Sequence, residues 1–66
     1  MDAKKIGGRL RKYRGERSIH SVAEEVGVSD SALYMYECGA RVPLDDIKVK
    51  LANCFNTTVQ ELFYQE

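Results

Sequence analysis

The histidine and cysteine side chains of this sequence do not form a catalytic or metal-binding pattern. His20 is the only histidine, and the only cysteines, Cys38 and Cys54, do not form a C-x-x-C pair. A structural zinc site needs four such ligands, and a hydrolytic triad needs a nucleophile and a carboxylate at recognisable spacing from the histidine. The sequence has no phosphate-binding loop either. We therefore expect no enzyme activity, no metal, no cofactor, and two reduced cysteines.

Residues 30–35 carry side chains that are suited to recognition. Asp30 can accept hydrogen bonds, while Ser31 and the Tyr34 hydroxyl can donate or accept them. Ala32 and Met35 add apolar surface. Such groups match the base edges and thymine methyl groups of the DNA major groove. Without an arginine, asparagine or glutamine for a bidentate contact, readout would depend on DNA shape, methyl contacts and water as much as on direct pairing.

Two short helices with a glycine between them are predicted to position these side chains. Ser18 is the expected N-cap of the first, which ends at Gly27, where a left-handed residue would close it. Ser29 is a good N-cap for the second, which Gly39 would close. Apolar residues at helical spacing give both helices a buried face: Val22, Ala23, Val26, Leu33 and Tyr36. This arrangement is a helix-turn-helix over about residues 18–38, a motif whose second helix enters the major groove.

The segment 22–43, V-A-E-E-V-G-V-S-D-S-A-L-Y-M-Y-E-C-G-A-R-V-P, resembles the phage Cro/repressor-type helix-turn-helix proteins, also called the XRE family. The matching positions are Val22, Ala23, Gly27, Val28, Ser29, Leu33, Tyr36, Glu37, Gly39, Arg41 and Pro43. The resemblance extends from Ile6 to Phe63. It implies an all-α fold, a compact five-helix lambda-repressor-like DNA-binding domain, which would occupy residues 1–66 as a single domain.

The resemblance also implies roles for individual residues. The base-reading residues would be Asp30, Ser31, Ala32, Tyr34 and Met35. The DNA backbone would be contacted by Arg17, Ser18, Ile19 and Arg41. Arg14 and Glu37 would form a buried structural clamp between the first helix and the recognition helix. Two alternatives stay open: Arg41 could instead cap carbonyl groups at the end of the recognition helix, and Asp30 could act only on the helix dipole.

Three further helices are predicted to complete the domain. Residues 3–14 place Ile6, Leu10 and Tyr13 on one side, and Gly7 and Gly8 are expected to weaken this helix. Pro43 would open a helix over about residues 44–54. Its apolar stripe would comprise Leu44, Ile47, Leu51 and Phe55. Asn56 could adopt a left-handed conformation at its end, and Thr58 with Glu61 would form a capping box for a last helix that carries Val59, Leu62 and Phe63.

Charge is unevenly distributed along a chain whose formal net charge is zero. Residues 1–17 contain seven basic and two acidic residues, or +5, and residues 18–66 contain three basic and eight acidic residues, or −5. A basic segment on an otherwise acidic body suits a protein that meets phosphates with one face. The same segment could also be an ordinary solvated helix face.

These observations predict a sequence-specific DNA-binding transcriptional regulator that acts as a repressor by docking the second helix of the motif over a promoter. The partners would be a palindromic double-stranded operator and a second copy of the chain, paired through the two C-terminal helices with Phe63 and Tyr64 in an apolar patch. The alternative is a protein-interaction module with the same fold, such as an antitoxin or a regulator partner. No apolar run reaches about 18 residues and no signal-peptide pattern is present, so we expect a cytoplasmic protein without a membrane partner.

Overall fold

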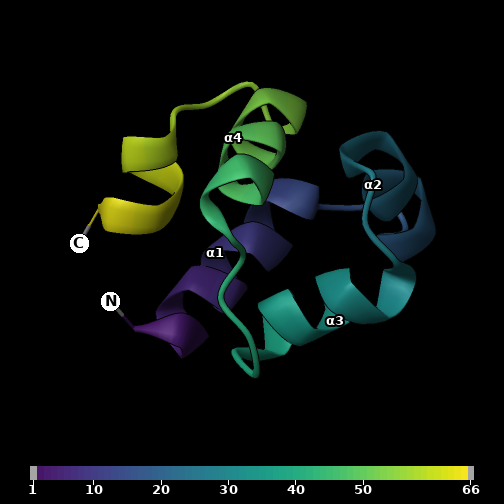
Figure 1. Cartoon of the computed structure of the whole chain (residues 1–66), viewed down its shortest axis with the longest axis horizontal. Coiled ribbons are helices and arrows are strands. Elements are labelled where there is room, and N and C mark those ends of the chain that lie inside the picture. Colours follow the sequence, from purple (N-terminus) through teal and green to yellow (C-terminus); the bar gives the residue numbers. More distant parts are fainter. Residues whose placement is uncertain (1, 66) are drawn as a thin grey trace.

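The computed structural model describes residues 2–65, so the first and last positions of the predicted domain lie outside the described part. Within that range the chain forms five helical elements and no strand. They are α1 (Ala3–Arg14), α2 (Ile19–Val26), α3 (Asp30–Cys38), α4 (Asp45–Cys54) and a π-helical turn, η1 (Gln60–Tyr64). In Figure 1, α4 lies between η1 and α2, and α1 passes behind α4 and leads to α2. The predicted all-α, five-helix fold is confirmed.

The ends of α2 and α3 are set by the cap residues that the sequence predicts. The Ser18 and Ser29 side chains each accept a hydrogen bond from a first-turn backbone amide of the helix that follows. Gly27 and Gly39 close the two helices in the left-handed region, with φ of 88° and 78°. Because a residue without Cβ adopts this conformation at little cost, both helices stop where the chain must turn.

The predicted start of α4 is wrong by one residue. Leu44 has an extended backbone, with ψ of 162°, and occupies the N-cap position before the helix begins at Asp45. Its side chain is therefore outside the helical register of Ile47 and Leu51, and it is 75% exposed. Pro43 is buried just before this cap. Leu44 thus does not belong to the apolar stripe of this helix.

Only half of the predicted capping box forms at the last helical element. Asn56 takes the expected positive φ, 56°, and the Thr58 hydroxyl accepts a hydrogen bond from the Glu61 amide at 3.1 Å. The Glu61 carboxylate does not return to Thr58 but accepts from the Thr57 hydroxyl at 3.0 Å. The element that follows is a single π-helical turn, which still buries Leu62 completely.

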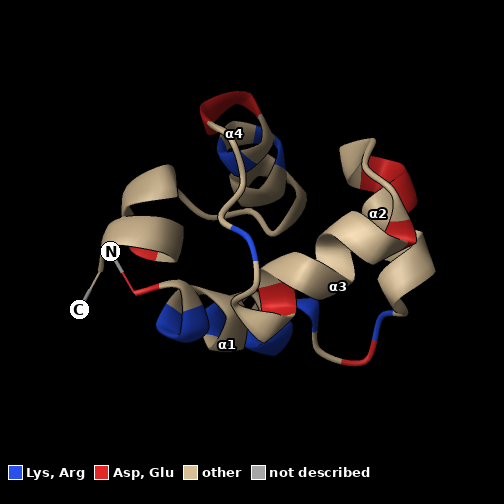
Figure 2. Cartoon of the chain, turned by 60° about the horizontal axis from the view of Figure 1, so that its bottom comes forward, with Lys and Arg blue, Asp and Glu red and all other residues tan. Residues whose placement is uncertain are grey.

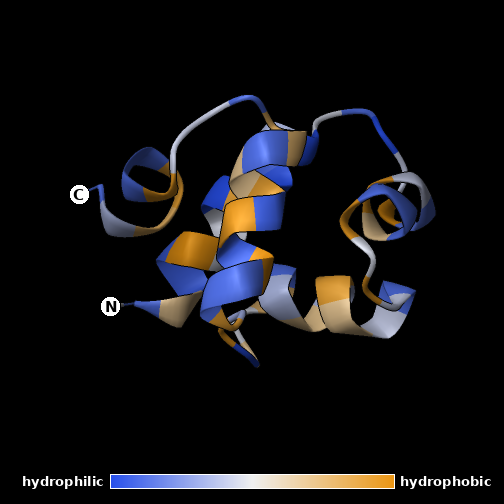
Figure 3. Cartoon of the chain, turned by 45° about the horizontal axis from the view of Figure 1, so that its top comes forward, coloured by the Kyte–Doolittle hydropathy of each residue, from blue (hydrophilic) through white to orange (hydrophobic). Residues whose placement is uncertain are grey.

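All five elements contribute to one hydrophobic core, and the apolar faces of the helices turn towards each other in Figure 3. The core residues are Ile6, Leu10, Val22, Ala23, Val26, Leu33, Tyr36, Leu51, Ala52, Leu62 and Phe63. Tyr13 stands at its edge, 40% exposed, with its ring stacked on Phe55 at a centroid distance of 5.8 Å. The longest described helix, α1, has 12 residues, and no helix of residues 2–65 is long and apolar enough to cross a membrane.

Two basic side chains join the C-terminal turn to the rest of the molecule. Arg9 donates to the Leu62 carbonyl at 2.8 Å and also to the Gln65 carbonyl. Lys48 is 6% exposed, with Nζ 3.0 Å from the Tyr64 hydroxyl and above the rings of Phe63 and Tyr64. Phe63 itself is only 3% exposed. The expectation that Phe63 contributes to an exposed apolar patch is therefore wrong, because its ring completes the core beneath Lys48.

Candidate nucleic-acid interface

The backbones of α1 and α3 touch at Gly7, and this contact fixes the C-terminal end of α3. A Cβ atom at Gly7 would lie 2.3 Å from the Glu37 carbonyl oxygen and 2.7 Å from the Tyr36 carbonyl oxygen. At Gly39 a Cβ would lie 3.0 Å from the Cα of Lys4. Gly7 was expected only to weaken its helix. The structure shows that the missing side chain is what allows the two helices to cross so closely.

The predicted pair of Arg14 and Glu37 is present beside this crossing. Arg14 Nε lies 2.7 Å from one Glu37 carboxylate oxygen, and a terminal nitrogen lies 3.0 Å from the other. The side chains are 16% and 7% exposed. A third bond, 2.7 Å long, runs from Arg14 to the carbonyl of Arg17. The hydrogen bonds to Glu37 raise the pKa of Arg14, so the Arg14 guanidinium of this bidentate pair stays charged.

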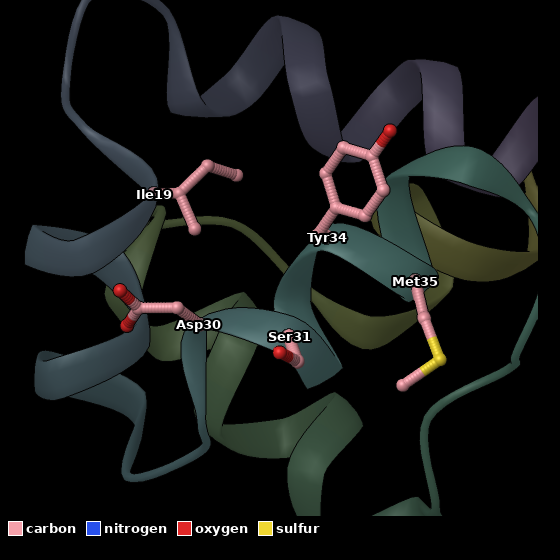
Figure 4. Close-up of a pocket in the computed structure, with 5 residues that line it drawn as sticks. All are labelled: Ile19, Asp30, Ser31, Tyr34 and Met35. Carbon is pink, nitrogen blue, oxygen red and sulfur yellow. The ribbon is translucent and has the colours of Figure 1, made fainter.

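The other end of α3 presents its side chains to solvent. An open depression of about 470 Å³ is lined by Asp30, Ser31, Tyr34 and Met35 of α3 and by Ile19 of α2 (Figure 4). Positions 30, 31, 34 and 35 lie on one face of a helix, which explains why they come together. Four of the five predicted base-reading residues thus share one surface.

Two of the predicted contact residues lie in places that the sequence did not indicate. Ala32 is partly buried and packs against the core, so it does not line the depression. Ile19, expected at the DNA backbone, lies in the depression opposite Tyr34 (Figure 4). The turn formed by residues 27–29 brings the start of α2 beside the start of α3, and this makes the first residue of α2 part of the same surface.

His20 forms a polar contact between the starts of the two motif helices. Its Nδ1 lies 3.1 and 3.2 Å from the two carboxylate oxygens of Asp30, and its Nε2 lies 3.7 Å from a Glu24 oxygen. The imidazole is exposed, as expected, but it is not isolated. The Asp30 carboxylate therefore already has a hydrogen-bonding partner within the molecule.

The Tyr34 hydroxyl stays protonated at neutral pH. A hydrogen bond with Cys38, one turn later in α3, raises the pKa of Tyr34. A protonated phenol can donate as well as accept a hydrogen bond. Tyr34 is 62% exposed, so this hydroxyl is available to a phosphate or to a base edge.

The residues predicted to contact the DNA backbone differ in their surroundings. The Ser18 hydroxyl already caps α2 by accepting from the Ser21 amide at 3.0 Å. Arg17 turns towards Glu25, with a nitrogen–oxygen distance of 2.7 Å, and its other nitrogen is 3.6 Å from the sulfur of Cys54. Its guanidinium therefore lies between α2 and α4. Of the predicted basic contacts, Arg17 already has a partner within the molecule.

Arg41 is exposed in the connection between α3 and α4 and forms no ion pair or side-chain hydrogen bond with residues 2–65. The end of α3 is closed by backbone amides instead: Gly39 donates to the Tyr36 carbonyl and Ala40 to the Met35 carbonyl. Within residues 2–65, Arg41 therefore does not cap these carbonyl groups, and its alternative role is wrong.

Basic residues follow α1, whereas acidic residues gather on α2 and at the start of α4 (Figure 2). Arg9 and Arg14 make the internal contacts described above. The remaining basic residues of α1 form no ion pair within residues 2–65: Lys4, Lys5, Arg11 and Lys12. Because α1 packs directly on α3, this positive charge lies next to α3.

The two cysteines are free thiols. Cys38 is exposed at the end of α3, and Cys54 is partly buried at the end of α4, where burial raises its pKa. A raised pKa keeps a thiol protonated and poorly nucleophilic. No cluster of three or more possible metal ligands occurs among the residues that the structure describes.

Comparison with known proteins agrees with this geometry. A helix-turn-helix family model, HTH_3, matches residues 9–62. Among solved structures, the restriction-modification controller protein C.AhdI from Aeromonas hydrophila is 31% identical, covers 94% of this chain and 97% of its own, and superposes with a TM-score of 0.87. No curated protein sequence matches the chain significantly.

A second solved structure, the clp gene regulator ClgR from C. glutamicum, is 19% identical over 94% of this chain and 83% of its own, with a TM-score of 0.81. This likeness shows a shared fold. Together, the family match over most of the chain and the observed motif establish that the protein belongs to the XRE-type helix-turn-helix family of DNA-binding transcriptional regulators.

Proposed function

We propose that this regulator is a sequence-specific repressor that inserts α3 into the major groove of an operator and excludes polymerase from the promoter. The observation that carries the proposal is the division of α3. Its C-terminal end is held by Gly7 and by the ion pair of Arg14 and Glu37, while its N-terminal end exposes a shared recognition surface. The 31% identity to a restriction-modification controller protein supports a role in controlling restriction-modification genes.

Four residues of α3 would read bases and the surrounding residues would meet phosphates. Ser31 can pair with several base edges, and Asp30 can accept from cytosine N4. Arg41 is the principal backbone contact, because it is exposed and has no partner within residues 2–65. The backbone amides of the N-cap Ser18 and of Ile19 would receive a phosphate at the positive end of α2. Arg17 would reach DNA only by leaving Glu25.

The protein would bind as a homodimer on a palindromic site. Two copies related by a two-fold axis would place their recognition helices about 34–36 Å apart, one turn of B-DNA. The interface would lie on the C-terminal half, where Leu44, Val49 and Tyr64 are exposed apolar side chains. Sedimentation of the wild-type chain and of Leu44→Asp and Val49→Asp would test this, since a dimer through that surface should dissociate in at least one variant.

Selection of binding sites from a random double-stranded DNA library tests the proposed function. We expect an enriched palindrome with half-site centres about 10 base pairs apart, and an affinity that falls steeply with salt because phosphate contacts release counterions. Absence of enrichment, with only weak salt-dependent binding, would contradict sequence-specific reading. It would favour the protein-interaction module instead.

Variants of α3 then test which residues read the operator. Ser31→Ala and Tyr34→Phe remove single hydrogen-bonding groups from exposed positions, so stability should change by less than about 0.5 kcal/mol. Selection with each variant should enrich an operator whose base differs from the wild-type operator at one position per half-site. If both select the unchanged operator with unchanged affinity, α3 is not the reading element.

A further inference from the structure

The depression at the start of α3 has an apolar character that hydrogen-bonding readout does not explain. Ile19, Tyr34 and Met35 contribute carbon surface to it, and Ser31 lies between Asp30 and Met35 (Figure 4). The Asp30 carboxylate points away from Tyr34 and Met35 and is held by His20 Nδ1 at 3.1 Å. The only charged group of the lining is thus directed to its rim, and Ile19 faces the depression with carbon surface.

Ile19 is the residue that most clearly sets this character. It begins α2 directly after the N-cap Ser18, at a point where a polar side chain could meet a phosphate. An isoleucine cannot make that contact. It is partly buried against the core, and its remaining surface lines the depression.

The major groove offers one apolar group to such a surface. Base edges there present hydrogen-bond donors and acceptors, except for the methyl group at C5 of thymine. Cytosine acquires a methyl group at the same ring position when it is methylated at C5. Since α3 faces the groove in the proposed function, the group that fits in front of Ile19 is the methyl group of a 5-methylpyrimidine.

We propose that Ile19, with Tyr34 and Met35, forms a binding site for the methyl group of a 5-methylpyrimidine and makes this regulator sensitive to that methyl group at one position of each half-site. The assignment rests on the proposed function, because it needs α3 in the major groove. It adds Ile19 of α2 as a specificity-determining residue, separate from the hydrogen-bonding residues of α3.

Base replacements in the operator that remove or add one methyl group test this site. In the operator obtained by selection, each thymine is replaced in turn by deoxyuridine, which removes only the methyl group, and affinity is measured by fluorescence anisotropy with the full chain. We expect one replacement per half-site to weaken binding about fourfold, the factor that corresponds to burying one methyl group. In a second series each cytosine is replaced by 5-methylcytosine. A gain of similar size at one cytosine, without a sensitive thymine, identifies methylated cytosine as the source.

Protein variants assign the effect to Ile19. Ile19→Ala should bring the ratio of affinities for the methylated and unmethylated operators to about one, because the methyl contact is lost. Ile19→Val, which disturbs the core less, should reduce this ratio. Ile47→Ala, the same change at a residue of α4 that is also partly buried against the core but does not line the depression, should retain the full ratio. Thermal unfolding of each variant verifies that it is folded at the assay temperature.

Two results would overturn the assignment while leaving the proposed function intact. The first is an enriched operator in which neither replacement series changes affinity at any position. The second is a methyl effect that survives in both Ile19 variants, which would place the methyl group elsewhere. Failure of the selection itself would count against the proposed function, and the methyl site would fall with it.

Discussion

The two ends of α3 differ in how the molecule holds them. At the C-terminal end, the backbone of α1 touches the backbone of α3 at Gly7, and Glu37 is fixed by two hydrogen bonds from Arg14. At the N-terminal end, Asp30 has one exposed partner, His20, and Tyr34 projects into solvent. The C-terminal end is thus anchored by buried contacts, whereas the N-terminal end presents its side chains to solvent.

This difference indicates a separation of tasks along one short helix. Anchoring by backbone contact and a bidentate pair sets the orientation of α3 without using any of the side chains that line the depression. Substitutions at the anchored end should therefore reduce stability, and substitutions at the presented end should alter DNA preference at little cost in stability. The following predictions test that separation, beginning with the largest effect.

Glu37→Ala should have the largest effect on stability. It leaves Arg14, only 16% exposed, without its partner, and breaking a buried ion pair in this way costs roughly 3–5 kcal/mol. Chemical denaturation measures the loss. Glu24→Ala, which removes a carboxylate that is 78% exposed, is the matched control and should change stability by less than about 0.5 kcal/mol. A loss below about 1 kcal/mol for Glu37→Ala would mean that the pair is a minor surface contact.

Gly7→Ala should destabilise the protein by about 1–3 kcal/mol, because its Cβ would meet the Glu37 carbonyl at 2.3 Å and force α1 and α3 apart. Gly8→Ala provides a sharp control in the same helix. A Cβ there meets nothing within 4 Å, so the variant should gain up to about 1 kcal/mol from helix propensity. Equal melting temperatures for the two variants would refute the close crossing.

Arg41→Ala should leave stability unchanged and weaken DNA binding. The side chain has no ion pair within residues 2–65, so the substitution removes only the proposed phosphate contact. The slope of log K against log salt should fall by about 1, with a similar loss of affinity on every DNA sequence. Titration of the operator and of a scrambled duplex at several salt concentrations measures this. An unchanged slope would remove Arg41 from the interface.

The smallest effect is expected at Glu25, which belongs to neither end of α3. A hydrogen bond from Cys54, together with one from Arg17, lowers the pKa of Glu25 below its ordinary value of 4.5. A lowered carboxyl pKa contributes stability above 4.5 that is lost as the pH falls through the folded-state pKa. Wild type should therefore be slightly more stable than Glu25→Gln at pH 7, and the difference should vanish in acid. A constant difference from pH 7 to pH 3 would contradict this.

Local signals in the sequence were sufficient to predict the motif. Ser18, Gly27, Ser29 and Gly39 act on the backbone within a few residues, and all four have the predicted cap roles. The same reasoning failed at Leu44, since a helical stripe does not define the residue at which the helix begins. The presence of each helix was thus easier to predict than the residue at which it begins.

Contacts between distant residues could not be predicted in the same way. Gly7 looks like a helix-weakening residue until its neighbour in space, Glu37, is known. His20 and Asp30 are ten residues apart on different helices, and no pattern links them before the turn is built. The pair of Arg14 and Glu37 was anticipated only because a resemblance to known proteins supplied it.

Lys48 offers a consequence for chemical labelling. Its amine is 6% exposed and lies against Tyr64, whereas the other lysines, Lys4, Lys5, Lys12 and Lys50, are exposed. An amine-reactive reagent should modify those four while the protein is folded and should reach Lys48 only when α4 and η1 separate. The rate at which Lys48 is labelled would then report how often this closed structure opens, without a denaturant.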